Sequence, residues 1–116
     1  MKTVTLVIRS GPTAALGTRE MVDMALVLAT LECPVSVVLQ DAGVLWASLP
    51  TMPESSPLAL SGKLKSLPLY DIETIYVDQS SAERRGLTIS AQFPGCLASR
   101  DTISHWLAST DVILEA

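Results

Sequence analysis

The sequence of 116 residues is poor in charged residues, in aromatic residues and in histidine. Only 17% of its residues are charged, against about 25% in an average soluble domain, and only 4% are aromatic. The 8 lysines and arginines are outnumbered by 12 aspartates and glutamates, which gives a net charge of −4. A chain without an excess of basic residues lacks the positive surface that binds phosphate backbones. We therefore expect no direct contact with nucleic acid.

Long apolar runs are missing as well. The longest strictly apolar run covers residues 24–29, far fewer than the ~20 residues that cross a bilayer. The first apolar stretch, residues 4–8, is interrupted by Thr5 and followed by Arg9, which does not fit a signal peptide. We expect no membrane contact and a cytoplasmic location.

Motifs for common catalytic and metal sites are also lacking. The glycines have neither dinucleotide-binding nor P-loop spacing. Cys33 and Cys96 form neither a C-x-x-C pair nor a zinc pattern, and neither is followed six residues later by an arginine. His105 has no second histidine with which to bind a metal, and its predicted helix turns it to solvent. We expect no cofactor and no metal, and we interpret both cysteines as structural, less clearly for Cys96 because it follows a turn.

What the composition does supply is an excess of apolar residues, 48% of the chain, with a mean hydropathy of +0.39. In a chain of single-domain size these residues can fill a sheet that helices cover on both faces. Others can form a contact surface, because large exposed apolar patches on soluble proteins usually bind partners. We expect both uses, in one domain that spans residues 1–116.

Four segments have the β-branched, apolar composition of buried strands: residues 4–8, 35–39, 72–77 and 111–114. One more strand is expected within residues 87–98, near residues 96–98, and its bounds are left open. Helical patterns lie between them, at residues 19–31, 44–49, 58–67 and 80–85 and after residue 99. Thr18, Ser80 and Ser99 are the expected N-caps, with Ser80 and Glu83 forming a capping box. Gly86 is the expected left-handed end of its helix. The alternation predicts an α/β fold, a parallel sheet between helices, and residues 50–57, with three prolines, predict an exposed loop.

The helix at residues 19–31 is apolar nearly all round from residue 24 onward. Because the sheet can cover only one side of it, we expect another chain to cover the other. Trp46 adjoins the predicted loop, and large aromatic side chains often anchor interfaces. The residues predicted to contact a partner are Trp46, Met24, Val27, Leu28 and Tyr70.

Ligand sites in open parallel sheets lie beyond the carboxyl ends of the strands. In this sequence those positions are residues 10–13, 41–43 and 78–81. A small polar molecule held by residues 10–13 and Asp41 is one alternative, but the sequence shows no set of polar groups that would converge on it.

Several stretches resemble the DsrE/DsrF-like family and, within it, the TusC and DsrF subunits. They are residues 17–20, 69–73, 76–78, 81–87 and 111–114; the family prefers an acidic residue where this chain has Ala42. The resemblance implies a three-layer α/β/α domain with a five-stranded parallel sheet. It also implies a heterohexamer that contains two copies each of three related subunits. The two partner subunits are TusB/DsrH-like and TusD/DsrE-like, and the complex as a whole contacts the proteins that donate and accept sulfur.

In that family one subunit carries a persulfide on a cysteine just after the third strand, and the matching residue here is Asp78. A cysteine before a helix would have a lowered pKa and could hold and pass on sulfane sulfur. A carboxylate cannot form a persulfide. The resemblance therefore implies no catalytic residue in this chain, and we expect Asp78 to cap the helix that follows it.

These observations favour a non-catalytic docking subunit of a sulfurtransferase complex, TusC-like and serving 2-thiolation of the tRNA wobble uridine. One alternative is a DsrF-like subunit in dissimilatory sulfur oxidation. Another is a stand-alone thiol enzyme that uses Cys96.

Overall fold

The computed structural model describes residues 2–12, 15–49 and 60–116. The described strands form one five-stranded sheet in the order β4-β3-β2-β1-β5, and every neighbouring pair is parallel. The strands are β1 (Val4–Ile8), β2 (Val35–Leu39), β3 (Ile75–Asp78), β4 (Cys96–Ala98) and β5 (Val112–Glu115). The predicted α/β fold with five parallel strands is confirmed. The predicted loop at residues 50–57 lies outside the described residues.

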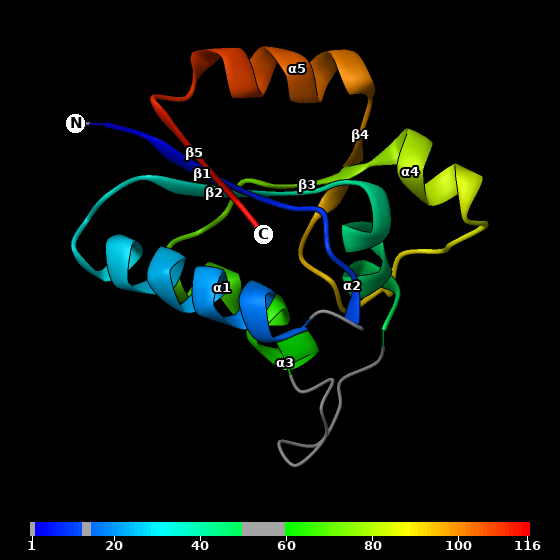
Figure 1. Ribbon diagram of the computed structural model, residues 1–116, viewed down its shortest axis with the longest axis horizontal. Coiled ribbons are helices and arrows are strands. Elements are labelled where there is room, and N and C mark those ends of the chain that lie inside the picture. The colour runs from blue at the N-terminus through cyan, green and yellow to red at the C-terminus, as the bar shows by residue number, and fades with distance from the viewer. Residues whose placement is uncertain (1, 13–14, 50–59) are drawn as a thin grey trace.

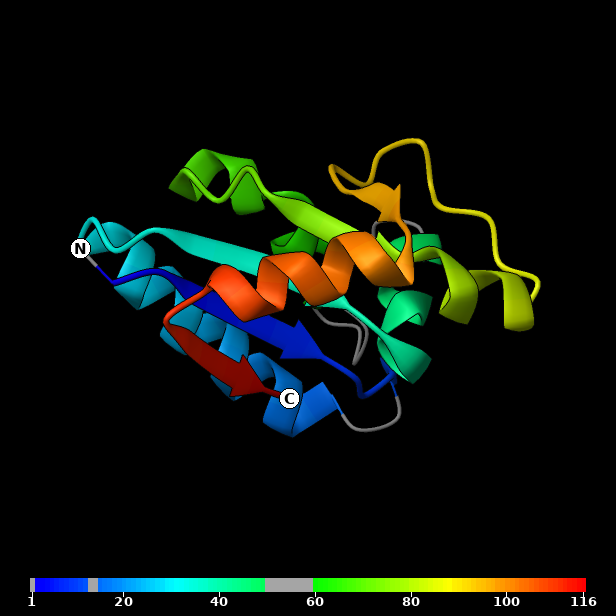
Figure 2. The same cartoon turned by 90° about the horizontal axis from the view of Figure 1, so that it is seen from above.

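Helices cover both faces of the sheet, which gives three layers (Figure 1). The helices α1 (Ala15–Thr30) and α3 (Leu60–Lys65) lie on one face, and α5 (Arg100–Ser109) lies on the other. From above, α5 crosses the middle of the sheet while β4 and β5 form its edges (Figure 2). None of the described helices is long and apolar enough to cross a membrane.

The two central strands are buried along their whole length because both of their faces are covered. All five residues of β1 and all five of β2 are buried. On the α1 side, Leu6 and Leu39 pack with Val22 of the helix. On the α5 side, Val7 and Val38 pack with Ile103. The continuous apolar runs in the sequence therefore reflect a sheet with two buried faces.

Several local predictions agree with the structure. The strands β1 and β2 have the predicted bounds, and β4 lies within the stretch where a strand was expected. Ser99 caps α5, and its side chain accepts a hydrogen bond from the backbone N–H of Thr102 at 3.2 Å. Gly86 has a φ of 62°, the left-handed conformation expected after a helix.

Two predicted helix starts are wrong. The helix α1 begins at Ala15, so Thr18 lies inside it, buried, and is not an N-cap. The helix α4 (Gln79–Arg84) begins before Ser80, and its N-cap position is Asp78. The side chain of Glu83 is hydrogen-bonded to Gln79 and not to a capping serine. The predicted capping box therefore does not form.

Candidate functional site: a polar cluster at the carboxyl edge of the sheet

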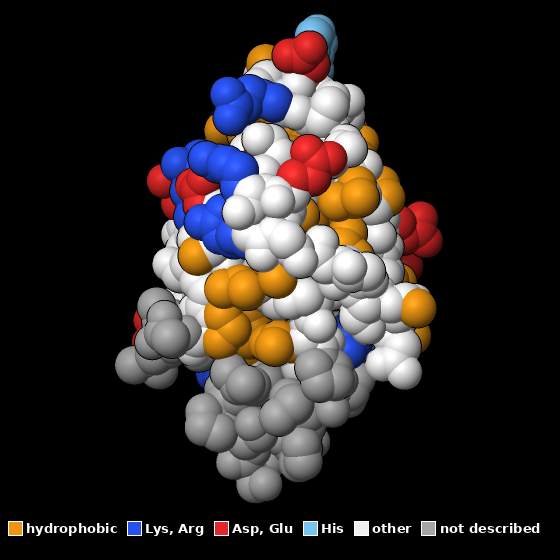
Figure 3. Space-filling model, turned by 90° about the vertical axis from the view of Figure 1, so that its right-hand side faces the viewer, with side chains coloured by type: hydrophobic (Ala, Val, Ile, Leu, Met, Phe, Trp, Pro, Cys, Tyr) orange, Lys and Arg blue, Asp and Glu red, His pale blue; other side chains and the backbone are white. Residues whose placement is uncertain are grey.

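The carboxyl ends of β1, β2 and β3 meet at one end of the molecule, as expected for a parallel sheet. After β2 the chain forms a short 3₁₀ helix, η2 (Asp41–Val44), followed by α2 (Leu45–Ser48); after β3 it forms α4. Figure 3 looks onto this end, where lysine and arginine side chains gather above patches of hydrophobic side chains. Of the three segments named from the sequence, residues 10–12, 41–43 and 78–81 therefore lie at one edge, while residue 13 lies outside the described residues.

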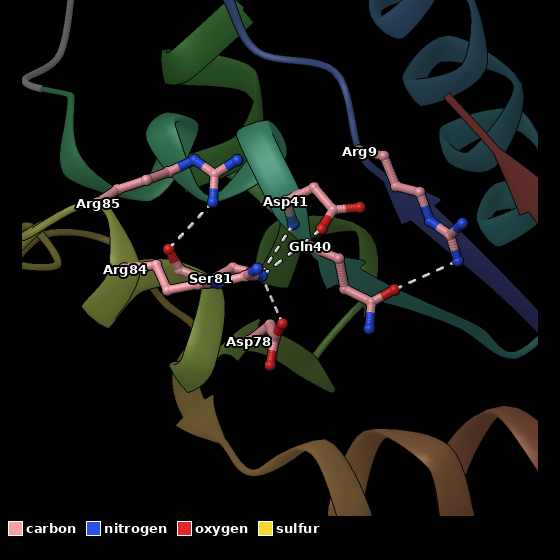
Figure 4. Close-up of polar contacts among 7 residues, drawn as sticks. All are labelled: Arg9, Gln40, Asp41, Asp78, Ser81, Arg84 and Arg85. Atoms are coloured by element: carbon pink, nitrogen blue, oxygen red, sulfur yellow. Dashed lines mark hydrogen bonds and ion pairs between the residues drawn. The ribbon is translucent and has the colours of Figure 1, made fainter.

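Asp78 is the most buried charged side chain of this cluster, with 5% of its surface exposed. Its Oδ2 atom accepts a hydrogen bond of 2.6 Å from the hydroxyl of Ser81 (Figure 4). Its Oδ1 atom has no hydrogen-bond partner among the described residues. Asp78 occupies the N-cap position of α4, but its side chain caps no backbone N–H there. Asp78 therefore lies at the predicted N-cap position, but the predicted capping hydrogen bond from its side chain does not form.

Ser81 joins Asp78 to the segment that follows β2. Its hydroxyl donates to Asp78 and accepts a hydrogen bond of 3.0 Å from the backbone N–H of Asp41. Asp41 has a φ of 52°, a conformation that non-glycine residues rarely adopt and that aspartate tolerates better than most. The serine therefore fixes the position of η2 relative to β3. The sequence placed Ser81 at this edge but gave no sign of this bridge.

Three arginines lie along the same polar edge, and none of them forms a hydrogen bond or ion pair with Asp78 among the described residues (Figure 4). The guanidinium of Arg85 donates to the backbone carbonyl of Ser81 at 3.3 Å. Arg84 lies 4.0 Å from a carboxylate oxygen of Asp41, and Arg9 lies 3.5 Å from one of Glu115. All three arginine side chains are exposed. The ion pairs of Arg9 and Arg84 are exposed and therefore contribute little to stability.

The cysteines and the histidine lie outside this cluster. Cys33 is half-buried, and its thiol lies 3.4 Å from the backbone carbonyl of Lys2, in agreement with a structural role. Cys96 is exposed on the edge strand β4, and no hydrogen bond or ion pair joins its thiol to a described residue. His105 is exposed on α5, as predicted, with its ring hydrogen-bonded to the backbone carbonyl of Asp101 at 3.0 Å. Among the described residues no group of three potential ligands could hold a metal ion.

An exposed apolar surface lies on the α1 layer, away from the polar cluster. Met24 and Val27 of α1 and Tyr70 of the 3₁₀ helix η3 (Leu67–Tyr70) are exposed, and Leu28 is half-buried. Leu31 and Leu69 lie on the same layer, with 72% and 85% of their surface exposed, and were not among the residues predicted to contact a partner. The spacing of residues 24, 27 and 31 along one helix could have revealed Leu31.

Trp46 is not part of that surface. Its side chain is fully buried, and its indole N–H donates to the backbone carbonyl of Ser10 at 3.0 Å. The prediction that Trp46 contacts a partner is therefore wrong, because α2 turns this side chain into the core of its own chain. The position of Trp46 beside a predicted loop therefore did not predict whether its side chain is exposed.

The fold and the arrangement of its edge define the class of protein. It is a three-layer α/β/α domain with an all-parallel sheet, and the polar cluster lies where open parallel sheets place their sites. The model of the DsrE/DsrF-like family matches residues 2–115, and the chain belongs to that family.

A solved structure shows the same fold. The crystal structure of the ychN protein from E. coli matches over 100% of both chains, with a TM-score of 0.78 and 15% sequence identity. At that identity the similarity concerns the fold alone. None of the curated proteins matches the sequence of this chain.

Proposed function

We propose that this chain is a non-catalytic docking subunit of a complex that relays sulfane sulfur between proteins. The observation that carries the proposal is Asp78. It ends β3 directly before α4, where the family resemblance places the persulfide cysteine of a sister subunit. A carboxylate oxygen there accepts hydrogen bonds but cannot carry a sulfane sulfur, so the chemistry belongs to a partner.

The exposed apolar surface supports a docking role. Val27 of α1 and Leu31, the residue directly after this helix, expose 57% and 72% of their surface, and Leu69 and Tyr70 of η3 add to the same layer. Exposed apolar clusters of this kind on soluble proteins usually meet another protein. The partners in this proposal are TusB/DsrH-like and TusD/DsrE-like subunits in a heterohexamer, and the pathway is TusC-like 2-thiolation of the tRNA wobble uridine. The alternative, a DsrF-like role in sulfur oxidation, would use the same apolar surface for docking.

A stand-alone thiol enzyme is the second candidate, because the exposure of Cys96 makes its thiol accessible. A reactive thiol needs a base or a cation that favours the thiolate. Since no described residue forms a hydrogen bond or ion pair with Cys96, we favour the docking role.

Co-expression with TusB-like and TusD-like subunits, followed by size-exclusion chromatography, tests the docking role. We expect one complex that contains all three chains. Val27→Glu places a charge in the apolar surface, and burying an unpaired charge at an interface is costly; we expect its dissociation constant to rise at least ~30-fold.

Ser104→Glu is the matched control, because it adds the same charge to an exposed position of α5 on the opposite layer. It should leave assembly unchanged. Elution of the wild-type chain as a stable monomer beside its partners, or equal assembly of the two variants, would contradict the docking proposal as drawn here.

A further inference from the structure

A hollow lies at the end of the sheet opposite the polar cluster, beneath the last turn of α5. It has a volume of about 320 Å³, which is at the lower end for small-molecule sites. The amino ends of β1, β2 and β3 form one wall, and the carboxyl end of α5 forms the other. The described lining residues are Thr3, Pro34, Val35, Ser36, Asp71, Glu73, Thr74, Trp106, Ser109 and Thr110. The hollow is separate from the cluster around Asp78.

The charge around this hollow has one sign. Asp71 and Glu73 contribute carboxylates, and no ion pair joins either of them to a described residue. No lysine or arginine is among the described lining residues. The last turn of α5 also contains no basic residue, so the partial negative charge at its carboxyl end is not neutralised locally. Each of these features favours a cation.

Trp106 provides an aromatic surface whose orientation is fixed. Its indole N–H donates to the hydroxyl of Thr5 at 3.1 Å. Its ring packs against Tyr76 in a T-shaped arrangement, with centroids 5.6 Å apart. Trp106 also lines a neighbouring open hollow that contains Asp101. Trp106 lines the hollow at the end of the sheet together with Asp71 and Glu73, and tryptophan is the aromatic side chain that attracts organic cations most strongly.

Ser36 supplies an acceptor inside the hollow. Its side chain is more than nine-tenths buried, with 8% exposed, yet it lines the hollow. No hydrogen bond joins its hydroxyl to another described residue, whereas the nearby hydroxyls of Thr5 and Thr110 bond each other. Among the described residues, Oδ1 of Asp78 is the only fully buried side-chain oxygen without a partner, so the hydroxyl of Ser36 opens into the hollow that this residue lines. It is therefore available to accept a hydrogen bond from the donor group of a bound ligand.

We propose that this amino-edge hollow binds a small organic cation with an ammonium or guanidinium group. The cationic group lies against the face of Trp106, between the carboxylates of Asp71 and Glu73, and donates a hydrogen bond to Ser36. This site is independent of the sulfur-relay proposal, since it uses none of the residues around Asp78 and none of the α1 surface.

Titration of the ¹⁵N-labelled full chain with 1,4-diaminobutane, followed by NMR at constant ionic strength, tests the proposal. We expect saturable shifts confined to the amides of Ser36, Glu73, Thr74 and Ser109. The neutral analogue 1,4-butanediol should produce none of these shifts. Absence of saturable shifts up to about 20 mM diamine, far weaker than ordinary ligand affinities, would overturn the proposal, as would equal shifts with the diol.

Matched variants separate a built site from general attraction to an acidic protein. Asp71→Asn with Glu73→Gln should weaken binding roughly tenfold, because two exposed charge contacts are lost. Ser36→Ala, which changes no charge, should weaken it roughly threefold. Glu20→Gln with Glu83→Gln removes two exposed charges elsewhere and should change the affinity less than about twofold. If both double variants weakened binding of the diamine equally, the binding would depend on the net charge of the protein alone, and the proposed site would be overturned.

Discussion

Replacing Trp46 by alanine should lower the free energy of unfolding by about 3–5 kcal/mol, the usual cost of removing a buried large aromatic side chain. Its side chain is fully buried in the α1-side core. The substitution also removes the N–H that donates to the carbonyl of Ser10. Because whole domains are stable by only about 5–15 kcal/mol, this loss should be visible directly in urea unfolding followed by circular dichroism.

Trp46→Phe is the matched control for this measurement. Phenylalanine keeps most of the apolar volume but cannot donate to Ser10, so we expect a smaller loss of about 1–2 kcal/mol. A surface residue that contacts a partner would affect assembly and leave the free energy of unfolding nearly unchanged. If Trp46→Ala unfolded at the wild-type urea concentration and failed only in assembly with partners, the burial of this side chain would be contradicted.

Replacing Gly43 by alanine should be nearly as damaging, for a steric reason. A Cβ atom at this position would lie 1.9 Å from the backbone oxygen of Ile8 and 2.7 Å from its carbonyl carbon. That oxygen already accepts the hydrogen bond from the N–H of Gln40. Because backbone atoms cannot move aside as a flexible side chain does, we expect a loss of about 3 kcal/mol or more.

Gly17→Ala provides a control of opposite sign. Apart from its chain neighbours and the backbone of its own helix, no atom of the described residues lies within 4 Å of the position its Cβ would take, and the residue lies within α1. Alanine in a helix is favoured over glycine by about 0.5–1 kcal/mol, so this variant should gain stability in thermal unfolding. Equal melting temperatures for the two variants would show that the end of β1 does not press against Gly43.

The sheet could be predicted because the composition of each central strand is a local signal. The runs that became β1 and β2 are apolar and β-branched over five consecutive residues, and such runs need two covered faces. The start of α1 was missed because Gly17 weakens the helical pattern there. Thr18, which resembled an N-cap, is buried instead in the second turn of the helix. Local capping chemistry was outweighed by packing against the rest of the chain.

The candidate site was predictable in place but not in its contacts. The topology rule put Asp41, Asp78 and Ser81 at one edge of the sheet, and the structure brings them together. The hydrogen bond between Ser81 and the N–H of Asp41 spans 40 residues, and no local pattern encodes it. The burial of Trp46 depends in the same way on Ser10, 36 residues earlier. The amino-edge hollow combines residues from four separate stretches of the chain, residues 3, 34–36, 71–74 and 106–110, and could not be found from sequence spacing.

The central claim is that this chain contributes contacts with partner subunits and no group that carries sulfur. The most direct measurement is the rate of sulfur transfer to an acceptor thiol by the complex reconstituted with its partners, comparing the wild-type chain with a Cys33→Ser/Cys96→Ser variant. Since both cysteines are removed and Asp78 cannot form a persulfide, we predict equal rates. Loss of transfer in the variant, together with a persulfide on Cys96 of the wild-type chain, would contradict the account.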